Sequence, residues 1–205
     1  MTALERFLKY ITFDTQSEEG SEATPSTEKQ RALGRVLARE LAEMGLEGAC
    51  LADNGAVYGW LPATPGREDV PVIALIAHMD TAPRVPGGPM KARVVSYEGG
   101  VLVLNEEKGI ALSPAAFPDL LEQVGKQLVV TDGTTLLGAD DKAGVAEIFA
   151  AVERLVRDPR LAHGRVAVCI TPDEEVGRGA DYVDLARLGR VCLYGGRGSA
   201  GDAGV

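Results

Sequence analysis

Two continuous apolar runs, each leading into a cluster of polar residues, constrain the fold of this chain most. Residues 72–77 read Val-Ile-Ala-Leu-Ile-Ala and are followed directly by His78-Met79-Asp80. Residues 166–170 form a second apolar run, which leads into Asp173-Glu174-Glu175. Uninterrupted apolar runs of this length are typical of strands that are covered on both faces. The sequence therefore predicts a sheet buried between other elements.

Helical patterns alternate with these strands. Apolar residues recur at helical spacing, and helices are expected, at residues 3–11, about 27–44, 143–156, 117–124 and 181–188. Further strands are expected at residues 47–51, 57–61, 127–130 and 134–137, and a hairpin is predicted between residues 94–95 and 101–104. Ser26 or Thr27 is the expected cap of the second helix. Strands alternating with helices predict an α/β layered fold.

Three acidic motifs follow predicted strands. Besides the two named above, residues 136–144 read Leu-Leu-Gly-Ala-Asp-Asp-Lys-Ala-Gly, where an apolar stretch gives way to a helical pattern. In open α/β sheets, ligands bind beyond the carboxyl ends of the strands. This shared position makes the three motifs candidates for one common site.

The composition limits the classes of function. The chain has 205 residues, 45% hydrophobic content and a formal net charge of −9, which argues against nucleic acid or an anionic membrane as a partner. No apolar run approaches the roughly 20 residues of a membrane span. The three cysteines form no CxxC pair, so a reducing cytoplasm is the expected location. Only His78 and His163 are available for histidine chemistry, and His163 is interpreted as structural.

The residue types at these motifs suit a metal site. His78 and Asp80 alternate along an extended backbone, so both side chains can project to the same side. The two oxygens of Asp140 can bridge two cations. Of the adjacent Glu174 and Glu175, one can bind a metal while the other holds a water for proton transfer. Each motif has an alternative interpretation. His78 can be a core histidine whose hydrogen bonds are satisfied within the protein, the aspartate pair can contain a helix cap, and the glutamate pair can form a solvated turn.

The three motifs together resemble those of the M20 metallopeptidases. The matching stretches are His78-Met79-Asp80-Thr81, residues 138–144 and residues 172–177. Three further stretches, at residues 14–17, 24–27 and 131–135, are similar to the tripeptide aminopeptidases of that family. The resemblance covers roughly residues 1–189.

The resemblance implies a fold, a reaction and a role for each site residue. It implies the N-terminal part of a zinc-dependent exopeptidase domain, with a mixed sheet and helices on both faces, and without the family's lid or dimerisation domain. His78 and Glu175 resemble ligands of two different zinc ions, and Asp140 resembles the carboxylate that bridges them. Glu174 resembles the catalytic acid/base, and Asp80 the residue that orients His78 and supports catalysis. The implied substrates are tripeptides in the cytoplasm, and family members can be homodimers.

The chain departs from the family pattern near its end. An aspartate expected about twenty residues after the glutamate pair and a later histidine ligand are not found, which predicts little or no peptidase activity for these 205 residues. Codon degeneracy permits an Asp-Gly-Gly motif after a one-base shift near Gly189, and the hypothesis is that the reading frame slipped there; the nucleotide sequence tests it. Residues 190–205 are therefore expected to be disordered or out of frame, after a partial catalytic domain at residues 1–189. Another M20 dipeptidase or amidohydrolase, or a non-catalytic metal-binding fragment, remains the alternative.

Overall fold

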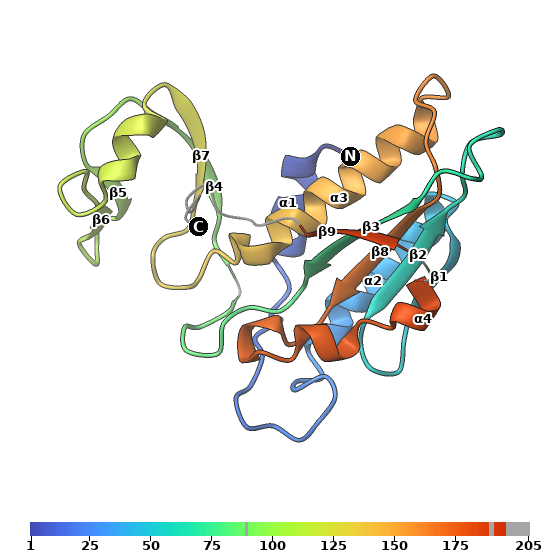
Figure 1. Cartoon of the computed structure of the whole chain (residues 1–205). Helices are drawn as coiled ribbons and strands as arrows, with labels where there is room; N and C mark the ends of the chain where they lie inside the picture. The colour runs from blue at the N-terminus through green and yellow to red at the C-terminus, as the bar shows by residue number, and fades with distance from the viewer. Residues whose placement is uncertain (89, 189–190, 196–205) are drawn as a thin grey trace.

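A five-stranded mixed sheet forms the centre of the protein (Figure 1). The computed structural model describes residues 1–88, 90–188 and 191–195. The strand order is β1 (Glu47–Leu51), β2 (Val57–Leu61), β8 (Val166–Thr171), β3 (Val72–His78) and β9 (Val191–Gly195). Neighbours are antiparallel from β1 to β8, and β3 runs parallel to both β8 and β9. The predicted α/β class with a mixed sheet is confirmed.

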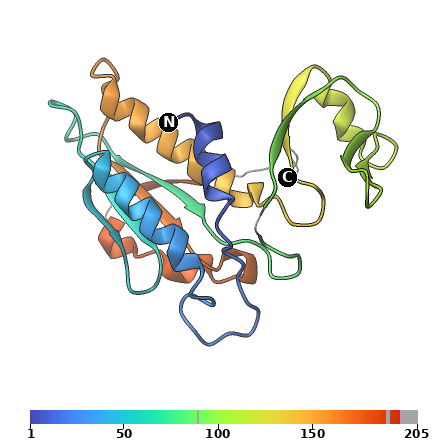
Figure 2. The same cartoon turned by 180° about the vertical axis from the view of Figure 1, so that it is seen from behind.

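Three helices cover one face of this sheet, as the reverse view shows (Figure 2). They are α1 (Ala3–Tyr10), α2 (Gln30–Glu43) and α3 (Ala139–Arg157). Their buried side chains recur every three or four residues, as an amphipathic helix on a sheet requires. The fully buried members of this core include Leu33, Leu37, Leu41, Val145, Phe149 and Val152.

Shorter helical elements cover the other face. Tyr58, Trp60 and Cys169 project there from β2 and β8, and they pack with Tyr182 and Leu188 in a second apolar cluster. The predicted helix at residues 181–188 is in fact a 3-10 turn, η3 (Gly179–Tyr182), followed by the one-turn helix α4 (Leu185–Leu188). Helical elements therefore lie on both faces, as predicted.

Residues between β3 and α3 form a small lobe beside the main sheet (Figure 1). It contains β4 (Arg93–Tyr97) paired with β7 (Lys126–Val130), β5 (Leu102–Asn105) paired with β6 (Ile110–Leu112), and the 3-10 helix η1 (Pro118–Gln123). The predicted hairpin between residues 94–95 and 101–104 is wrong. β4 and β7 instead match over five residue pairs, a ladder between segments far apart in the sequence that local turn signals do not reveal.

Helix α2 begins later than the sequence suggests. Its N-cap is Lys29, which makes no capping side-chain hydrogen bond, so neither Ser26 nor Thr27 caps this helix. The Ser26 hydroxyl instead donates to the Asp173 carboxylate, 147 positions away in the chain. A tertiary contact has replaced the local cap that the sequence favoured.

The end of the described chain corrects the predicted disorder. Val191–Gly195 form β9, which pairs in parallel register with β3 from Val72 to Ile76. The run Val-Cys-Leu-Tyr consists of residue types common in strands, and β3 offers an edge on which they can pair. Residues 196–205 lie outside the described residues, and the proposed frame shift and domain boundary stay predictions.

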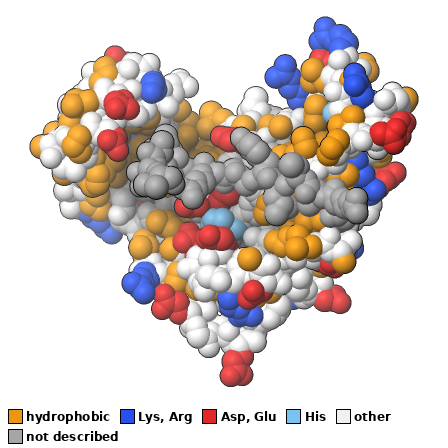
Figure 3. Space-filling view, viewed as in Figure 1, with side chains coloured by type: hydrophobic (Ala, Val, Ile, Leu, Met, Phe, Trp, Pro, Cys, Tyr) orange, Lys and Arg blue, Asp and Glu red, His pale blue; other side chains and the backbone are white. Residues whose placement is uncertain are grey.

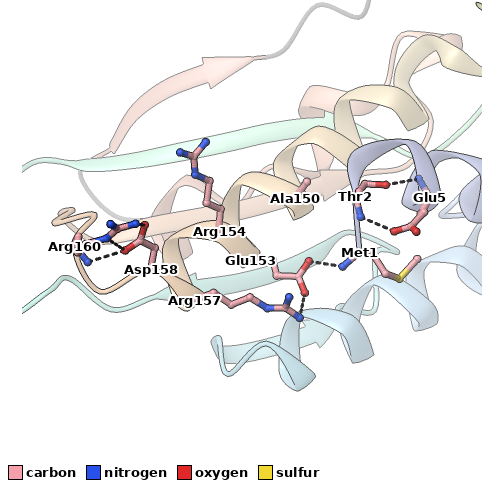
Figure 4. Close-up of a pocket in the computed structure, with 9 residues that line it drawn as sticks. All are labelled: Met1, Thr2, Glu5, Ala150, Glu153, Arg154, Arg157, Asp158 and Arg160. Atoms are coloured by element: carbon pink, nitrogen blue, oxygen red, sulfur yellow. Dashed lines mark hydrogen bonds and ion pairs between the residues drawn. The ribbon is translucent and has the colours of Figure 1, made fainter. Parts of the chain in front are cut away.

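A groove lies between α1 and the end of α3 (Figure 4). None of the described residues that line it belongs to the acidic motifs. The groove encloses about 680 Å³. Glu153 on its floor accepts hydrogen bonds from the Met1 amine at 2.8 Å and from Arg6 at 3.0 Å, and it pairs with Arg157 at 2.6 Å. These paired charges join α1 to α3, and we interpret this groove as structural.

Candidate metal centre

The register between β3 and β8 brings two of the predicted motifs together. His78, the last residue of β3, lies opposite Thr171, the last residue of β8. Because the two strands are parallel, the segments that follow them leave the sheet side by side. One segment carries Asp80, and the other forms the 3-10 turn η2 (Glu174–Val176). Histidine and acidic side chains accordingly gather in the middle of the face shown in Figure 3.

The third motif reaches this position from the start of α3. Gly138 precedes the helix in a left-handed conformation, with φ of 71°. Asp140 and Asp141 have non-helical backbone angles, so the regular helix begins after them. The side chain of Asp140 is 71% exposed and extends towards His78. Asp140 thus points to the imidazole, while Asp141 is the residue that directly precedes the regular helix.

The five predicted site residues lie together. His78 Nε2 is 3.0 Å from Asp140 Oδ1 and 3.7 Å from Glu174 Oε2. One ligand atom each from His78, Asp140 and Glu175 lies within 4.8 Å of the other two. One imidazole nitrogen with carboxylate oxygens is a donor set typical of zinc in enzymes. The residues present therefore fit a bound metal ion.

Asp80 connects the two strand ends behind this donor set. Its carboxylate is fully buried and lies 3.3 Å from His78 Nδ1. The same carboxylate accepts the backbone N–H groups of Glu174 at 3.0 Å and Glu175 at 3.1 Å. A carboxylate on the far nitrogen of a metal-binding histidine fixes the orientation and tautomer of the ring. Asp80 is thus placed to orient His78 and the glutamate turn together.

The electrostatics of the cluster favour a cation. Burial lowers the pKa of His78, but hydrogen bonding to Asp80 and the surrounding negative charges outweigh it and raise this pKa to about 9. Burial raises the pKa of Asp141 to about 6, and burial also raises the pKa of Glu175. Several acids surround one imidazole, so positive charge is stabilised here.

Two residues next to Asp140 support the start of α3. Lys142 is fully buried, and its Nζ donates to the carbonyl of Phe13 at 2.8 Å. Gly144 leaves room for the Asp141 carboxylate, because a Cβ at this position would lie 2.2 Å from Asp141 Oδ1. The local sequence around Gly144 gives no sign of this contact, since only the bend at Asp140 and Asp141 brings the carboxylate back over the helix.

Replacing Gly144 with alanine should destabilise the protein by about 1–3 kcal/mol, the usual cost of overpacking. The added methyl group must displace the buried Asp141 carboxylate. Gly34→Ala in α2 is the matched control, because its methyl group would need to displace only the flexible end of Leu51, 2.8 Å away, while Met79 and Val57 lie at an ordinary contact distance of 3.6 Å. Urea denaturation measures both variants. A Gly144→Ala protein as stable as Gly34→Ala would contradict the expectation.

The other histidine lies elsewhere. His163 is in the loop that precedes β8, at the opposite end of that strand from the glutamate pair. Its Nδ1 lies 2.8 Å from the carbonyl oxygen of Gly164, and its backbone carbonyl accepts a hydrogen bond from Thr64. These contacts agree with the structural role predicted for it.

A hollow of about 350 Å³ adjoins the cluster. His78, Asp141 and Glu174 contribute to its wall, together with Thr171, Ala180 and Val183 among others. A ligand in this hollow would contact both polar groups of the cluster and apolar groups of the sheet. The cluster is therefore accessible to small molecules.

Known proteins are similar in sequence to this chain over nearly its whole length. No protein-family model matches the chain. A peptidase T of Clostridium acetobutylicum is 50% identical over 192 residues, which is 93% of this chain and 47% of that protein. A peptidase T of Desulfitobacterium hafniense is 52% identical over 194 residues, or 94% of this chain and 47% of its own length. This chain is a homologue of peptidase T. It spans about half the length of the curated relatives that it matches.

Solved structures agree with the relation to peptidase T. The aminopeptidase PepT of Bacillus cereus superposes with a TM-score of 0.63 at 26% identity, covering 94% of this chain and 42% of that structure. A tripeptidase of Staphylococcus aureus gives the same TM-score at 22% identity, which shows the fold alone. The resemblance seen in the motifs is thereby confirmed. Within the described residues, no helix is long and apolar enough to cross a membrane.

Proposed function

We propose that this chain carries the zinc-binding part of a metallo-aminopeptidase that releases the N-terminal residue of tripeptides. The observation that supports the proposal most is the convergence of His78, Asp140 and Glu175, whose ligand atoms lie within 4.8 Å of one another. They converge in a homologue of peptidase T, although they are far apart in the sequence. A cytoplasmic location and small peptides as the partners complete the proposal.

His78, Asp140 and Glu175 would hold the metal. We assign His78 to one zinc ion, Glu175 to a second, and Asp140 to both, because a carboxylate has two oxygens while each imidazole nitrogen binds one ion. The side chain of Asp140 is 71% exposed at the start of α3, so its carboxylate would be open to a metal ion. Zinc bound here supplies Lewis acidity, which lowers the pKa of a water molecule and polarises a peptide carbonyl.

Glu174 is assigned to proton transfer. Its side chain is 56% exposed, and its Oε2 lies 3.7 Å from His78 Nε2, so it borders the donor set and faces the solvent. The carboxylate accepts a proton from the attacking water as the new C–O bond forms. It then gives that proton to the amide nitrogen as the C–N bond breaks, which balances the hydrolysis. Asp80 acts behind this step by orienting His78.

Zinc titration calorimetry on the full chain tests the metal centre. We expect zinc to bind at the stoichiometry of one or two ions per chain. Because two ligands of the family pattern are missing, we expect the zinc-loaded chain to hydrolyse peptides little or not at all, with any residual hydrolysis greatest on tripeptides. If the folded chain binds no more zinc than a heat-denatured sample does, the proposed metal centre is contradicted. A preference for dipeptides or N-acyl amino acids would contradict the assignment of tripeptides as substrates, and it would favour another hydrolase of the M20 type.

A further inference from the structure

The residue before the glutamate pair makes more buried contacts than either glutamate. Asp173 is fully buried, and its carboxylate accepts four hydrogen bonds. Oδ1 accepts from the Ser26 hydroxyl at 2.5 Å and from Gln30 Nε2 at 2.6 Å. Oδ2 accepts from the Ser26 backbone N–H at 2.7 Å and from the Tyr182 hydroxyl at 2.9 Å. A carboxylate offers about four acceptor sites, so the group is saturated.

The backbone of Asp173 is held by the same partners. Its N–H donates to Gln30 Oε1 at 3.2 Å, so the Gln30 amide contacts both the side chain and the main chain of Asp173. Gln30 and Ser26 are themselves buried. These contacts join the segment before α2 to the turn after β8, across about 145 residues of sequence. Ser26, in the stretch at residues 24–27, is thus hydrogen-bonded to the acidic motif at residues 172–177.

The conformation of Asp173 explains why such a clamp is needed. Asp173 is the one described non-glycine residue with positive φ, at φ 58° and ψ 26°. The left-handed region is unfavourable for L-residues other than glycine, and aspartate adopts it only as a single residue. This bend directs the next two N–H groups, those of Glu174 and Glu175, to the Asp80 carboxylate. Loss of the clamp would let the backbone relax and would withdraw both N–H groups.

The segment that carries Ser26 also holds the other strand end. The Ser17 N–H and hydroxyl both donate to the Thr81 carbonyl, at 3.0 Å and 3.1 Å, and the Thr81 N–H donates to the Thr15 carbonyl at 3.3 Å. Thr81 follows Asp80 directly. One segment, residues 15–30, therefore contacts both turns that carry the predicted metal ligands.

We propose that Asp173 is a positioning residue of the metal centre, clamped by Ser26 and Gln30, which fixes Glu174 and Glu175 against Asp80. Asp173 touches none of the predicted ligands through its side chain and acts only through the turn. This inference rests on the proposed zinc centre for its functional meaning. The fixed turn itself can be tested without metal.

Asp173→Asn is the decisive variant, because it replaces an acceptor oxygen with an N–H₂ group that faces hydrogen-bond donors. We expect zinc affinity to fall about 10–100-fold, the usual effect of losing a residue that supports metal ligands. We also expect the Glu174 and Glu175 amides of the metal-free protein to exchange hydrogen at least about tenfold faster than in the wild type. The Ile170 amide in β8 serves as the internal reference, since general destabilisation would accelerate all three.

Two further variants complete the experiment. Asp181→Asn, an exposed aspartate in η3, is the matched control and should leave affinity and exchange unchanged. Ser26→Ala removes the hydroxyl that donates to Asp173 and keeps the Asp173 carboxylate. If Asp173→Asn does not fold, Ser26→Ala tests the positioning role instead. We expect it to change zinc affinity and amide exchange in the same direction by a smaller amount.

The outcomes separate the inference from the proposed function. Wild-type exchange at Glu174 and Glu175 in the folded variants would overturn the positioning role, whatever the zinc affinity. Zinc affinity unchanged in Asp173→Asn would overturn it as well. If the wild-type chain binds no zinc, the proposed function fails, while the amide exchange still decides whether Asp173 fixes the turn.

Discussion

Replacing His78 with alanine should weaken zinc binding by more than about 100-fold, since even the loss of a supporting residue costs 10–100-fold. His78 provides the single imidazole of the donor set, with its Nε2 3.0 Å from Asp140 Oδ1. Its loss leaves carboxylates alone, and these suit magnesium or calcium better than zinc. Calorimetric titration of the variant with zinc measures the effect.

The second histidine of the chain provides the control. His163→Ala should bind zinc as the wild type does, because His163 lies at the other end of β8. Urea denaturation of both variants shows whether the fold persists, and affinities are compared only between folded proteins. Equal zinc affinity of folded His78→Ala and wild type would exclude His78 as a ligand.

Replacing Phe149 with alanine should lower the free energy of unfolding by about 3–5 kcal/mol, the usual cost of removing a buried aromatic side chain. Phe149 is fully buried in α3, and its ring packs edge-on against that of Tyr10, with centroids 6.0 Å apart. The Arg6 guanidinium lies 5.8 Å from the same ring. The substitution would therefore separate α1 from α3 and leave a cavity between the helices and the sheet.

Val156→Ala in the same helix is the comparison for this change. Val156 is 41% exposed, and exposed positions commonly change stability by no more than about 0.5 kcal/mol. Urea denaturation followed by circular dichroism measures both variants. Similar losses for the two would show that the contact between α1 and α3 contributes little to the fold.

Four strands of the main sheet, β1, β2, β3 and β8, were predictable because their signals are local, whereas β9 was not predicted. The apolar run before His78 and the run before the glutamate pair each form a strand at the expected place, since burial on both faces selects such runs. The helix after Asp141 was predictable for the same reason, because apolar residues at helical spacing need only a neighbouring sheet. The pairing of β4 with β7 was not predictable, because the choice of a strand partner depends on residues 29 to 37 positions apart, from Tyr97 with Lys126 to Arg93 with Val130.

The sequence by itself determined which residues are suited to bind a metal, and it placed His78 and the glutamate pair correctly after strands. For Asp140 this expectation was wrong, because residues 134–137 form no strand and Asp140 lies at the start of α3. Only the tertiary structure decided that His78, Asp140 and Glu175 meet, because their proximity depends on the parallel register of β3 with β8 and on the bend that begins α3. It also decided the role of Ser26, whose local pattern indicated a helix cap. Its hydroxyl instead reaches Asp173, since a buried carboxylate without hydrogen-bond donors would be far more costly than an uncapped helix end.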